Sequence, residues 1–289
     1  GGGYSLETRL RERKSLQQFR VGLHYDDDFQ TAILLNYTHR NLLLRNSKLS
    51  VDVAVGVNPR LWVEYTYDRD LIPSFRLLFR SHRFQPRIYV DREELAQKTY
   101  LDFSLSASLQ SILVNHVLIG GGIQMEGIDL SASPNAMIFP ESFYQNYLNT
   151  FGYLDLDLLD RGTFPNKGLH LTGNYRLITR VEDFGTEFEP SSVLDVRYLQ
   201  VLPLWSGSSI YFRGSLLTTI GPDLDYPYNV FLGSMGENYI NYIHPFIGYR
   251  FMELVGRNAL VGGVDLNCQF LPNHYLIAKA NYATLEGTF

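Results

Sequence analysis

The sequence predicts an all-β fold, specifically a transmembrane antiparallel meander β-barrel, and three observations lead to this prediction. Apolar and polar residues alternate along many segments, which is typical of strands with one apolar face. Aromatic residues make up 14% of the 289 residues, an excess that suits strands and the aromatic girdles of membrane barrels. The polar positions carry Asp, Ser, Thr and Gly rather than the Lys and Glu that usually coat a solvated sheet.

The alternation is clearest in residues 48–57, KLSVDVAVGV, where leucine or valine occupies every second position. Neighbouring side chains of a strand point to opposite faces, so this segment has one apolar face and one small or polar face. The same pattern returns, in chain order, in residues 19–26, 61–68, 101–110, 153–158, 169–176, 210–216 and 260–270. These segments leave almost no room for helices.

Short turn-like stretches separate the expected strands. They include YDDD at 25–28, GVNP at 56–59, LDRGTFPNKG at 159–168, WSGSS at 205–209 and FLPNH at 270–274. Counting strand-plus-turn units gives about thirteen or fourteen strands. No composition shift marks a boundary after about residue 17, so we expect one barrel over residues 17–289. Residues 1–16 are far more charged and are expected to be a linker or the end of an upstream domain.

A soluble two-sheet sandwich is the alternative, because its strands also alternate. The expected strands hold the pattern for up to about ten residues, which is enough to cross a bilayer when tilted. No run of 18 apolar residues exists, so a transmembrane helix is not expected. A strand backbone in lipid can pair all its hydrogen bonds only in a closed barrel. Strand length and the composition of the polar faces therefore favour the barrel.

If the apolar sides meet lipid, the ionisable residues between them face a wet lumen. An arginine that faces lipid at mid-bilayer costs about 2–4 kcal/mol, so charged residues on these strands belong inside. Some of them should form cross-strand ion pairs, each worth little in a wet lumen. The expected lumen-facing charges are Glu64, Asp102, Asp155, Asp157, Arg176, Asp195, Arg197, Arg213 and Asp265.

The chemistry of known catalytic sites is not apparent in the sequence. The G-x-S-x-G nucleophile elbow is absent, and the seven histidines are scattered without metal-ligand spacing. Asp155 and Asp157 share one strand face about 7 Å apart, as some glycosidase carboxylates do, but a wet barrel wall explains them better. Cys268 is alone, and a net charge of −5 gives no reason to expect nucleic acid. We therefore expect no enzymatic activity in this chain and no metal, cofactor or nucleic acid.

Two stretches resemble known outer-membrane barrels. Residues 25–67, with GLHYD at 22–26 before them, LNYTHRNLL at 35–43 and GVNPR at 56–60 within them, resemble the opening hairpins of patatin-fused barrels. Residues 158–171, LLDRGTFPNKGLHL, resemble the D-x-x-x-F-P-x-K-G turn of the BamA-like outer-membrane barrel superfamily, also called bacterial surface antigens. The residues that match this turn are Asp160, Phe164, Pro165, Lys167 and Gly168.

A third stretch, residues 231–263, is similar to the sixth extracellular loop of that superfamily, which folds back into the lumen. The family loop carries a Val-Arg-Gly-Phe/Tyr tetrad whose arginine pairs with acids on the inner wall. Here Phe246, Ile247, Gly248 and Tyr249 occupy the tetrad, and isoleucine replaces the arginine. Arg250 is the neighbouring cation that remains to replace it. We expect Gly248 to let the loop backbone approach the wall closely.

The resemblance implies a barrel of sixteen strands in the bacterial outer membrane, with the last few strands lying after Phe289. Residues 1–16 would end a POTRA-like domain or a linker. The implied function is to anchor, and to translocate or display, an attached domain, as in type V secretion and other protein transport. A weak seam near residues 19–25 would accept client polypeptide by strand addition.

The partners implied are outer-membrane lipid and a client or fused passenger, and a homo-oligomer is left open. The alternatives are a passive porin, or the barrel part of a patatin-like phospholipase whose catalytic domain is not in this chain.

Overall fold

The computed structural model describes residues 16–26, 29–69, 72–90, 93–114, 116–131, 143–183, 190–205, 207–222, 225–234 and 243–287. Within these ranges the regular structure is strand, apart from two short 3-10 turns, η1 (Val181–Asp183) and η2 (Tyr226–Tyr228). No helix in the described part of the chain has the length and apolar character needed to cross a membrane. Of residues 1–16 only Leu16 is described, so their assignment to a POTRA-like domain or linker stays a prediction.

Thirteen strands form one antiparallel sheet in chain order, a meander with two insertions that hold small sheets of their own. The strands are β1 (Gln17–His24), β2 (Ala32–Arg40), β3 (Ser47–Gly56), β4 (Arg60–Arg69), β5 (Ile72–Phe84), β8 (Thr99–Leu113), β9 (Val117–Ser131), β10 (Phe143–Asp157), β11 (Gly168–Arg180), β12 (Ser191–Trp205), β13 (Ser208–Ile220), β17 (Asn258–Leu271) and β18 (His274–Glu286). The predicted meander is therefore confirmed, and its strand count agrees with the sequence estimate. The described sheet has β1 and β18 at its two edges, and these strands do not pair with each other.

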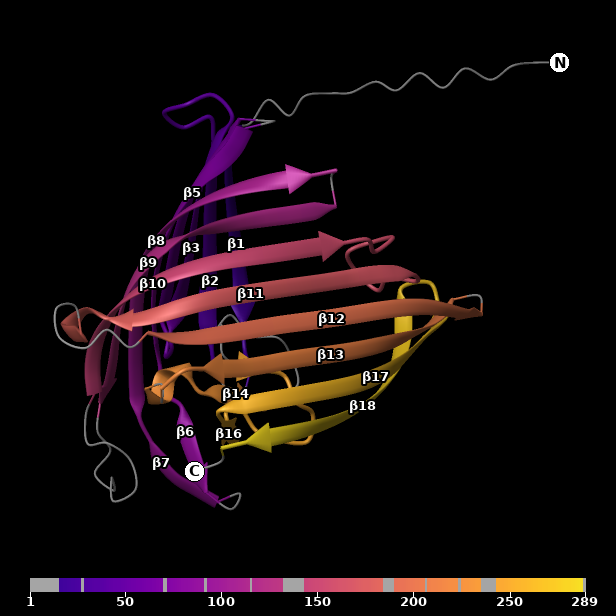
Figure 1. Ribbon diagram of the computed structural model, residues 1–289. Helices are drawn as coiled ribbons and strands as arrows, with labels where there is room; N and C mark the ends of the chain where they lie inside the picture. The colour runs from indigo at the N-terminus through magenta and orange to yellow at the C-terminus, as the bar shows by residue number, and fades with distance from the viewer. Residues whose placement is uncertain are drawn as a thin grey trace.

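The sheet is strongly curved, and its two ends differ (Figure 1). One end, the long-loop end, carries the connections 85–98 and 221–257. The other end, the short-turn end, carries 158–167, 206–207 and 272–273. The connection 85–98 contains a hairpin of β6 (Arg87–Val90) and β7 (Glu93–Gln97). The connection 221–257 contains η2 and a small sheet of β14 (Val230–Leu232), β15 (Ile243–His244) and β16 (Leu254–Gly256).

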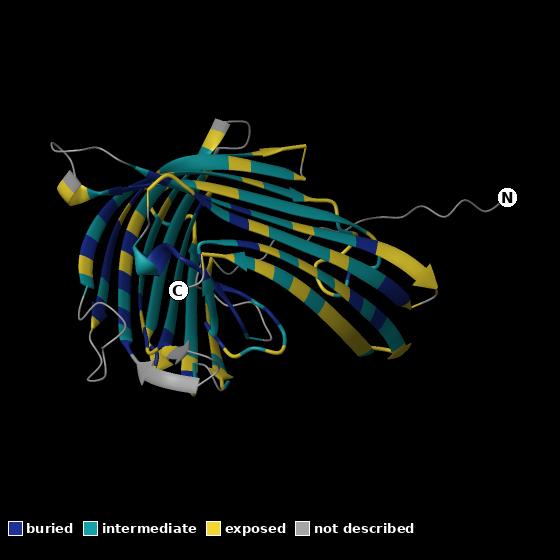
Figure 2. Ribbon diagram, turned by 60° about the horizontal axis from the view of Figure 1, so that its bottom comes forward, coloured by how far each residue is buried: buried dark blue, intermediate teal, exposed yellow. Residues whose placement is uncertain are grey.

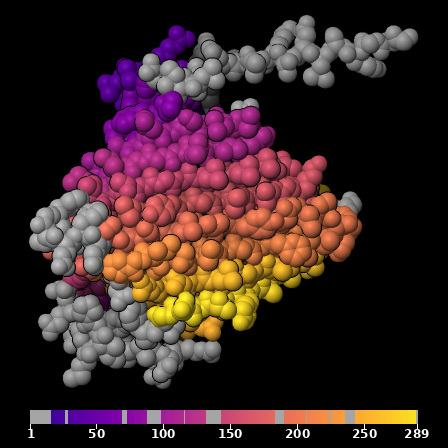
Figure 3. All heavy atoms as spheres, viewed as in Figure 1, coloured from indigo at the N-terminus to yellow at the C-terminus, as the bar shows by residue number. Residues whose placement is uncertain are grey.

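The outer face of the sheet is apolar and exposed. Along β8 and β9, Leu105, Leu109, Ile123 and Met125 point outward and are all more than half exposed. Bands of exposed and less exposed residues alternate along the strands in Figure 2, as period-two patterning requires. Figure 3 shows the outer surface as continuous parallel rows of side chains from successive strands. A surface this apolar is typical of a protein that meets lipid.

The inner face holds the core, and much of this core comes from the connection 221–257. Ile128, Tyr147 and Ile178 on the wall are buried in one cluster with Tyr228 and Phe251 of the connection. A second cluster joins Leu217 and Ala259 of the wall to Val230, Leu232 and Phe246. The lumen is therefore not polar throughout: at the long-loop end it is a packed apolar core that the sequence pattern did not predict.

Candidate functional site: the lumen and the loop packed in it

The strand register places all nine predicted lumen-facing charges on the inner face. Across adjacent strands, Asp155 lies opposite Thr172, Thr172 opposite Arg197, and Arg197 opposite Ser215, all on one face. Asp157 shares this face but lies at the end of β10, where its carboxylate accepts a hydrogen bond from the backbone N–H of Leu159 at 3.0 Å. Asp157 therefore supports the turn that follows it, whereas Asp155 contacts His170.

Most of the predicted acids contact an arginine, lysine or histidine on the same face. The pairs are Glu64 with Arg76 at 2.5 Å, Asp155 with His170 at 3.0 Å, Asp195 with Arg197 at 3.0 Å, and Asp265 with Arg213 and, at 4.0 Å, with Lys279. Acidic and basic side chains are therefore neighbours on the inner face.

Sequence reasoning missed several inner-face residues that the structure joins to this network. The inner face of β5 carries Arg76, Arg80 and His82, and the inner face of β9 carries Glu126. His82 Nδ1 lies 3.6 Å from Asp102 Oδ2, and both side chains are buried. A period-two reading of FRLLFRSHRF (75–84) and QMEGI (124–128) contains this signal, because these residues alternate with outward-facing Leu77, Phe79 and Met125.

The base of the connection 221–257 is fixed to the wall by Asp225. Its carboxylate accepts hydrogen bonds from Arg180 Nε and Nη2 at 2.9 and 2.5 Å and from the Tyr147 hydroxyl at 2.6 Å. A two-pronged arginine–carboxylate contact is among the stronger hydrogen-bonded ion pairs. This contact joins the loop to β10 and β11 at the long-loop end.

A second anchor lies one turn further, at Tyr228. Its hydroxyl donates to Glu126 Oε2 at 2.7 Å, and the same carboxylate oxygen accepts from Asn149 Nδ2 at 2.8 Å. Arg176 approaches this carboxylate at 3.7 Å, and the rings of Tyr228 and Tyr147 meet edge to face at 4.9 Å. Tyr228 and Glu126 are almost fully buried. We call Asp225 and Tyr228 with these partners the base clamp.

Further along, the loop contacts β12, next to the strands of the base clamp, and then β18. His244 Nε2 lies 3.5 Å from Asp195 Oδ2 and 3.3 Å from Arg197 Nη2 on β12. Asn281 of β18 donates to the Ile247 carbonyl at 3.3 Å. The loop therefore bridges β10–β12 on one side and β17–β18 on the other.

The tetrad residues lie at this second contact. Phe246 is buried in the core of the loop, and its ring packs on Tyr249 at 5.6 Å. Gly248 has φ +99°, and a Cβ there would meet nothing within 4 Å. The expected close approach to the wall is therefore wrong, and glycine is needed for its backbone conformation.

Arg250 is exposed, and its backbone N–H donates to Glu253 at 2.6 Å. The inner-wall acid Asp265 is instead paired with Arg213 from the wall itself. Whether Arg250 replaces the family arginine stays a prediction.

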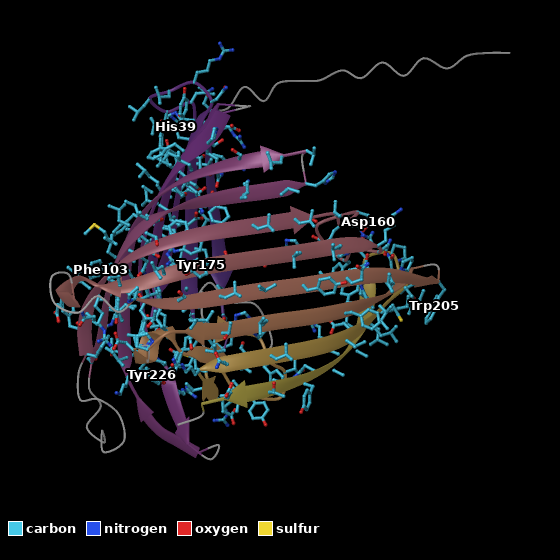
Figure 4. All side chains as sticks on the ribbon, in the orientation of Figure 1. His39, Phe103, Asp160, Tyr175, Trp205 and Tyr226 are labelled. Atoms are coloured by element: carbon cyan, nitrogen blue, oxygen red, sulfur yellow. The ribbon has the colours of Figure 1, made fainter. Side chains whose placement is uncertain are left out.

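The residues of the D-x-x-x-F-P-x-K-G turn lie at the short-turn end, between β10 and β11, where Figure 4 labels Asp160. The Asp160 carboxylate accepts the backbone N–H groups of Asn166 at 2.9 Å and Lys167 at 3.4 Å. Desolvation alone would raise the pKa of Asp160, but these hydrogen bonds and nearby Arg161 outweigh it and hold the pKa below its ordinary value. Gly168 has φ +122°, and a Cβ there would collide with the Leu158 carbonyl oxygen.

Cavities remain inside the curved sheet, and two of them lie on the β4–β18 part of the wall. One of about 480 Å³ is lined by arginines, including Arg76, Arg80 and Arg176, together with Trp62 and Tyr153. The other, of about 410 Å³, lies beside His244 and Ile247 of the loop. Within the described residues no group of His, Cys, Asp and Glu has the geometry of a metal site.

Comparison with known proteins identifies the family. The family model of the OMP85 superfamily matches residues 4–289. The chain belongs to the OMP85 superfamily. The predicted BamA-like superfamily membership is thereby confirmed, and with it a bacterial outer-membrane location for the barrel.

Solved structures agree on the fold. BamA from Haemophilus ducreyi, in a form lacking POTRA domains 1–3, matches with a TM-score of 0.76 at 13% identity, over 96% of this chain and 59% of that one. CdiB from Acinetobacter baumannii matches with a TM-score of 0.58 at 12% identity, over 94% of this chain and 50% of that one. The chain thus spans less than two thirds of these relatives.

None of the curated proteins compared with the sequence matches it. The resemblance to the patatin-fused branch stays a prediction.

Proposed function

We propose that this OMP85 barrel anchors an attached or client polypeptide at the outer membrane and translocates or displays it. The observation that carries the proposal is the loop 225–256, whose described parts, 225–234 and 243–256, pack into the lumen and are fixed by the base clamp and by His244. A passive porin needs an open lumen, whereas this loop fills the long-loop end with an apolar core. The packed loop argues against the porin, and the phospholipase barrel rests on the resemblance of residues 25–67 to patatin-fused barrels.

The orientation of the barrel follows from its connections. Outer-membrane barrels have short periplasmic turns and longer extracellular loops. We therefore place the short-turn end in the periplasm and the long-loop end, with the loop 225–256, at the cell surface. A polypeptide entering from the periplasm would meet the short-turn end first.

The edge strand β1 supports a role in handling polypeptide. Within the described sheet β1 pairs with β2, and along residues 18–24 its other edge has no second strand neighbour in that sheet. Phe19, Val21 and Leu23 of β1 point outward and are 64%, 65% and 82% exposed. An extended client segment could add to this edge by main-chain hydrogen bonds.

The test combines display and conductance. An epitope-tagged passenger fused before residue 1 should fractionate with the outer membrane and become accessible to protease added outside the cell. The purified barrel should show low, intermittent conductance in planar bilayers. A large, steady conductance together with a passenger retained in the periplasm would contradict the proposal and favour the porin.

A photo-reactive residue at Phe19 or Val21 tests the edge. It should crosslink to the passenger during export, whereas the same residue at the outward-facing Phe212 of β13, away from both edges, should not. Equal crosslinking at both positions would contradict strand addition at β1.

A further inference from the structure

The turn between β10 and β11 does more than reverse the chain, because it extends over the inner face of other strands. The Pro165 carbonyl accepts hydrogen bonds from the Tyr211 hydroxyl at 2.8 Å and from Ser209 at 3.4 Å, both on β13. The Phe164 ring stacks on Tyr275 of β18 with centroids 4.1 Å apart and planes 15° from parallel. Three strands, β12, β13 and β17, separate β11 from β18 in the sheet. The turn therefore crosses the short-turn end of the curved sheet.

The turn is built to hold this position. Arg161 donates from Nε to the Phe164 carbonyl at 2.6 Å and from Nη2 to Asn166 at 2.8 Å. Phe164 has φ +50°, a conformation that non-glycine residues adopt only where surrounding contacts hold them. The Tyr211 hydroxyl is in turn bonded by Asn267 of β17 at 2.9 Å, which continues the network across the wall. Phe164, the residue with the strained backbone, is also the one whose ring contacts β18.

The inner face of β13 shows what lies behind the turn. Ser209 and Tyr211 contact the turn, Arg213 and Ser215 line the 410 Å³ cavity, and Leu217 packs on the loop 225–256. The cavity therefore lies between the turn and the loop along this strand.

The same order is found on β18. Tyr275 contacts the turn, Lys279 and Asn281 line the cavity, and Ala283 and Leu285 pack against the loop cluster. Two separate segments thus bridge the same two sides of the sheet, one at each end of the cavity.

We propose that the 158–167 turn is a gate at the short-turn end of the lumen, closed by Phe164 on Tyr275 and by Pro165 on Tyr211. The lumen then has two closures, the loop at one end and this turn at the other. The inference deepens the proposed function, because a polypeptide entering from the periplasmic side would have to break the turn's contacts before it meets the loop.

Planar-bilayer recording of the purified barrel, with no client present, tests the gate. Phe164→Ala and Tyr275→Ala should each raise the ratio of open to closed time about three- to tenfold, the effect expected for losing one aromatic stack. The double variant should open no more often than the more active single variant, because both remove the same contact. Tyr275→Phe should behave as wild type, since the ring is retained.

Phe212→Ala is the matched control, because Phe212 is next to Tyr211 but points outward. It should leave the open-time ratio unchanged. Heat-modifiable gel migration shows which variants are folded. Folded Phe164→Ala and Tyr275→Ala barrels that open as wild type, or effects that add in the double variant, would overturn the gate.

A crosslinked variant keeps the test decisive if an alanine variant fails to fold. In Phe164→Cys/Tyr275→Cys/Cys268→Ser protein, a short thiol-reactive crosslink should suppress openings, and cleavage of the crosslink should restore them. Crosslinked barrels that open as often as cleaved ones would overturn the gate. Because no client is used, a failed display experiment leaves this result standing, and a failed gate leaves display untouched.

Discussion

The base clamp gives the sharpest single-atom prediction. Tyr228→Phe removes one hydroxyl, which donates to Glu126 at 2.7 Å and lies 3.4 Å from Asn149 Nδ2. The ring remains, so its edge-to-face contact with Tyr147 and its burial are kept. The change therefore isolates the hydrogen bond from the packing.

The expected size follows from the carboxylate partner. A hydrogen bond to a charged group contributes about 1.5–3 kcal/mol, and its loss leaves Glu126 with fewer donors in a buried site. At 1.4 kcal/mol per tenfold, the population with the loop detached should rise about ten- to hundredfold. Asn149 and Arg176 still contact Glu126, so we expect the lower half of this range.

Amide hydrogen exchange measures this population directly. Peptides that cover residues 225–234 and 243–257 should lose protection by the same factor, while β10 and β11 keep theirs. Tyr282→Phe is the control, because Tyr282 is 72% exposed on the outer face of β18. Unchanged loop protection in folded Tyr228→Phe protein would refute the clamp.

Three other predictions follow from the same structure. Gly168→Ala should lower the free energy of unfolding by about 1–3 kcal/mol, because alanine is strained at φ +122° and its Cβ would meet the Leu158 carbonyl. Gly162→Ala, with open space around the added methyl group, should change the free energy of unfolding little. Urea titration of the barrel in lipid vesicles measures both variants. Ile123→Lys, in the middle of β9 on the outer face, should cost about 2–4 kcal/mol in the same titration, whereas Asn174→Lys, lining the 480 Å³ cavity, should cost far less. Because the pKa of Asp160 is lowered in the folded protein, its stabilisation of the turn is complete above the ordinary pKa of 3.8 and is lost as the pH falls through the lower folded value. Hydrogen exchange of the Asn166 and Lys167 amides, corrected for intrinsic rates, should therefore accelerate only below about pH 3.8. The Asp160→Asn variant should lose this pH dependence.

The sequence was enough to predict the sheet, because the period of two is a local property. Alternation along a single strand is enough to assign each side chain to a face, so Val51 and Asp52 are placed on opposite faces without reference to the neighbouring strands. The same logic placed Asp195, Arg213 and Asp265 inside. It also reached Arg76 and Glu126, although only a strand-by-strand reading of FRLLFRSHRF and QMEGI would have found them.

The contacts between segments that are distant in the sequence leave no local pattern from which they could be predicted. Tyr228 meets Glu126 across 102 positions and Asp225 meets Arg180 across 45, and nothing local to either sequence predicts these pairs. The apolar core at the long-loop end was missed for the same reason. Ile128, Tyr147 and Ile178 break the polar pattern of the inner face because the loop covers them, so their burial depends on a segment far away in the chain.

Gly248 shows a subtler limit. The resemblance correctly selected a position that needs glycine, but the reason is its left-handed backbone rather than a close approach to the wall. Pattern matching identifies such positions, and only the backbone conformation distinguishes the two explanations.

The central claim is that side chains along each strand face lipid and the wet lumen in turn, with the outward-facing ones in lipid. Spin labels placed one at a time at positions 169–175 of β11, in Cys268→Ser protein in lipid vesicles, test it most directly. Collision with oxygen, which concentrates in lipid, should be highest at 169, 171, 173 and 175, and collision with a water-soluble nickel complex should be highest at 170, 172 and 174, which line the two cavities. A profile without this period of two, or with the two relaxants interchanged, would contradict the account.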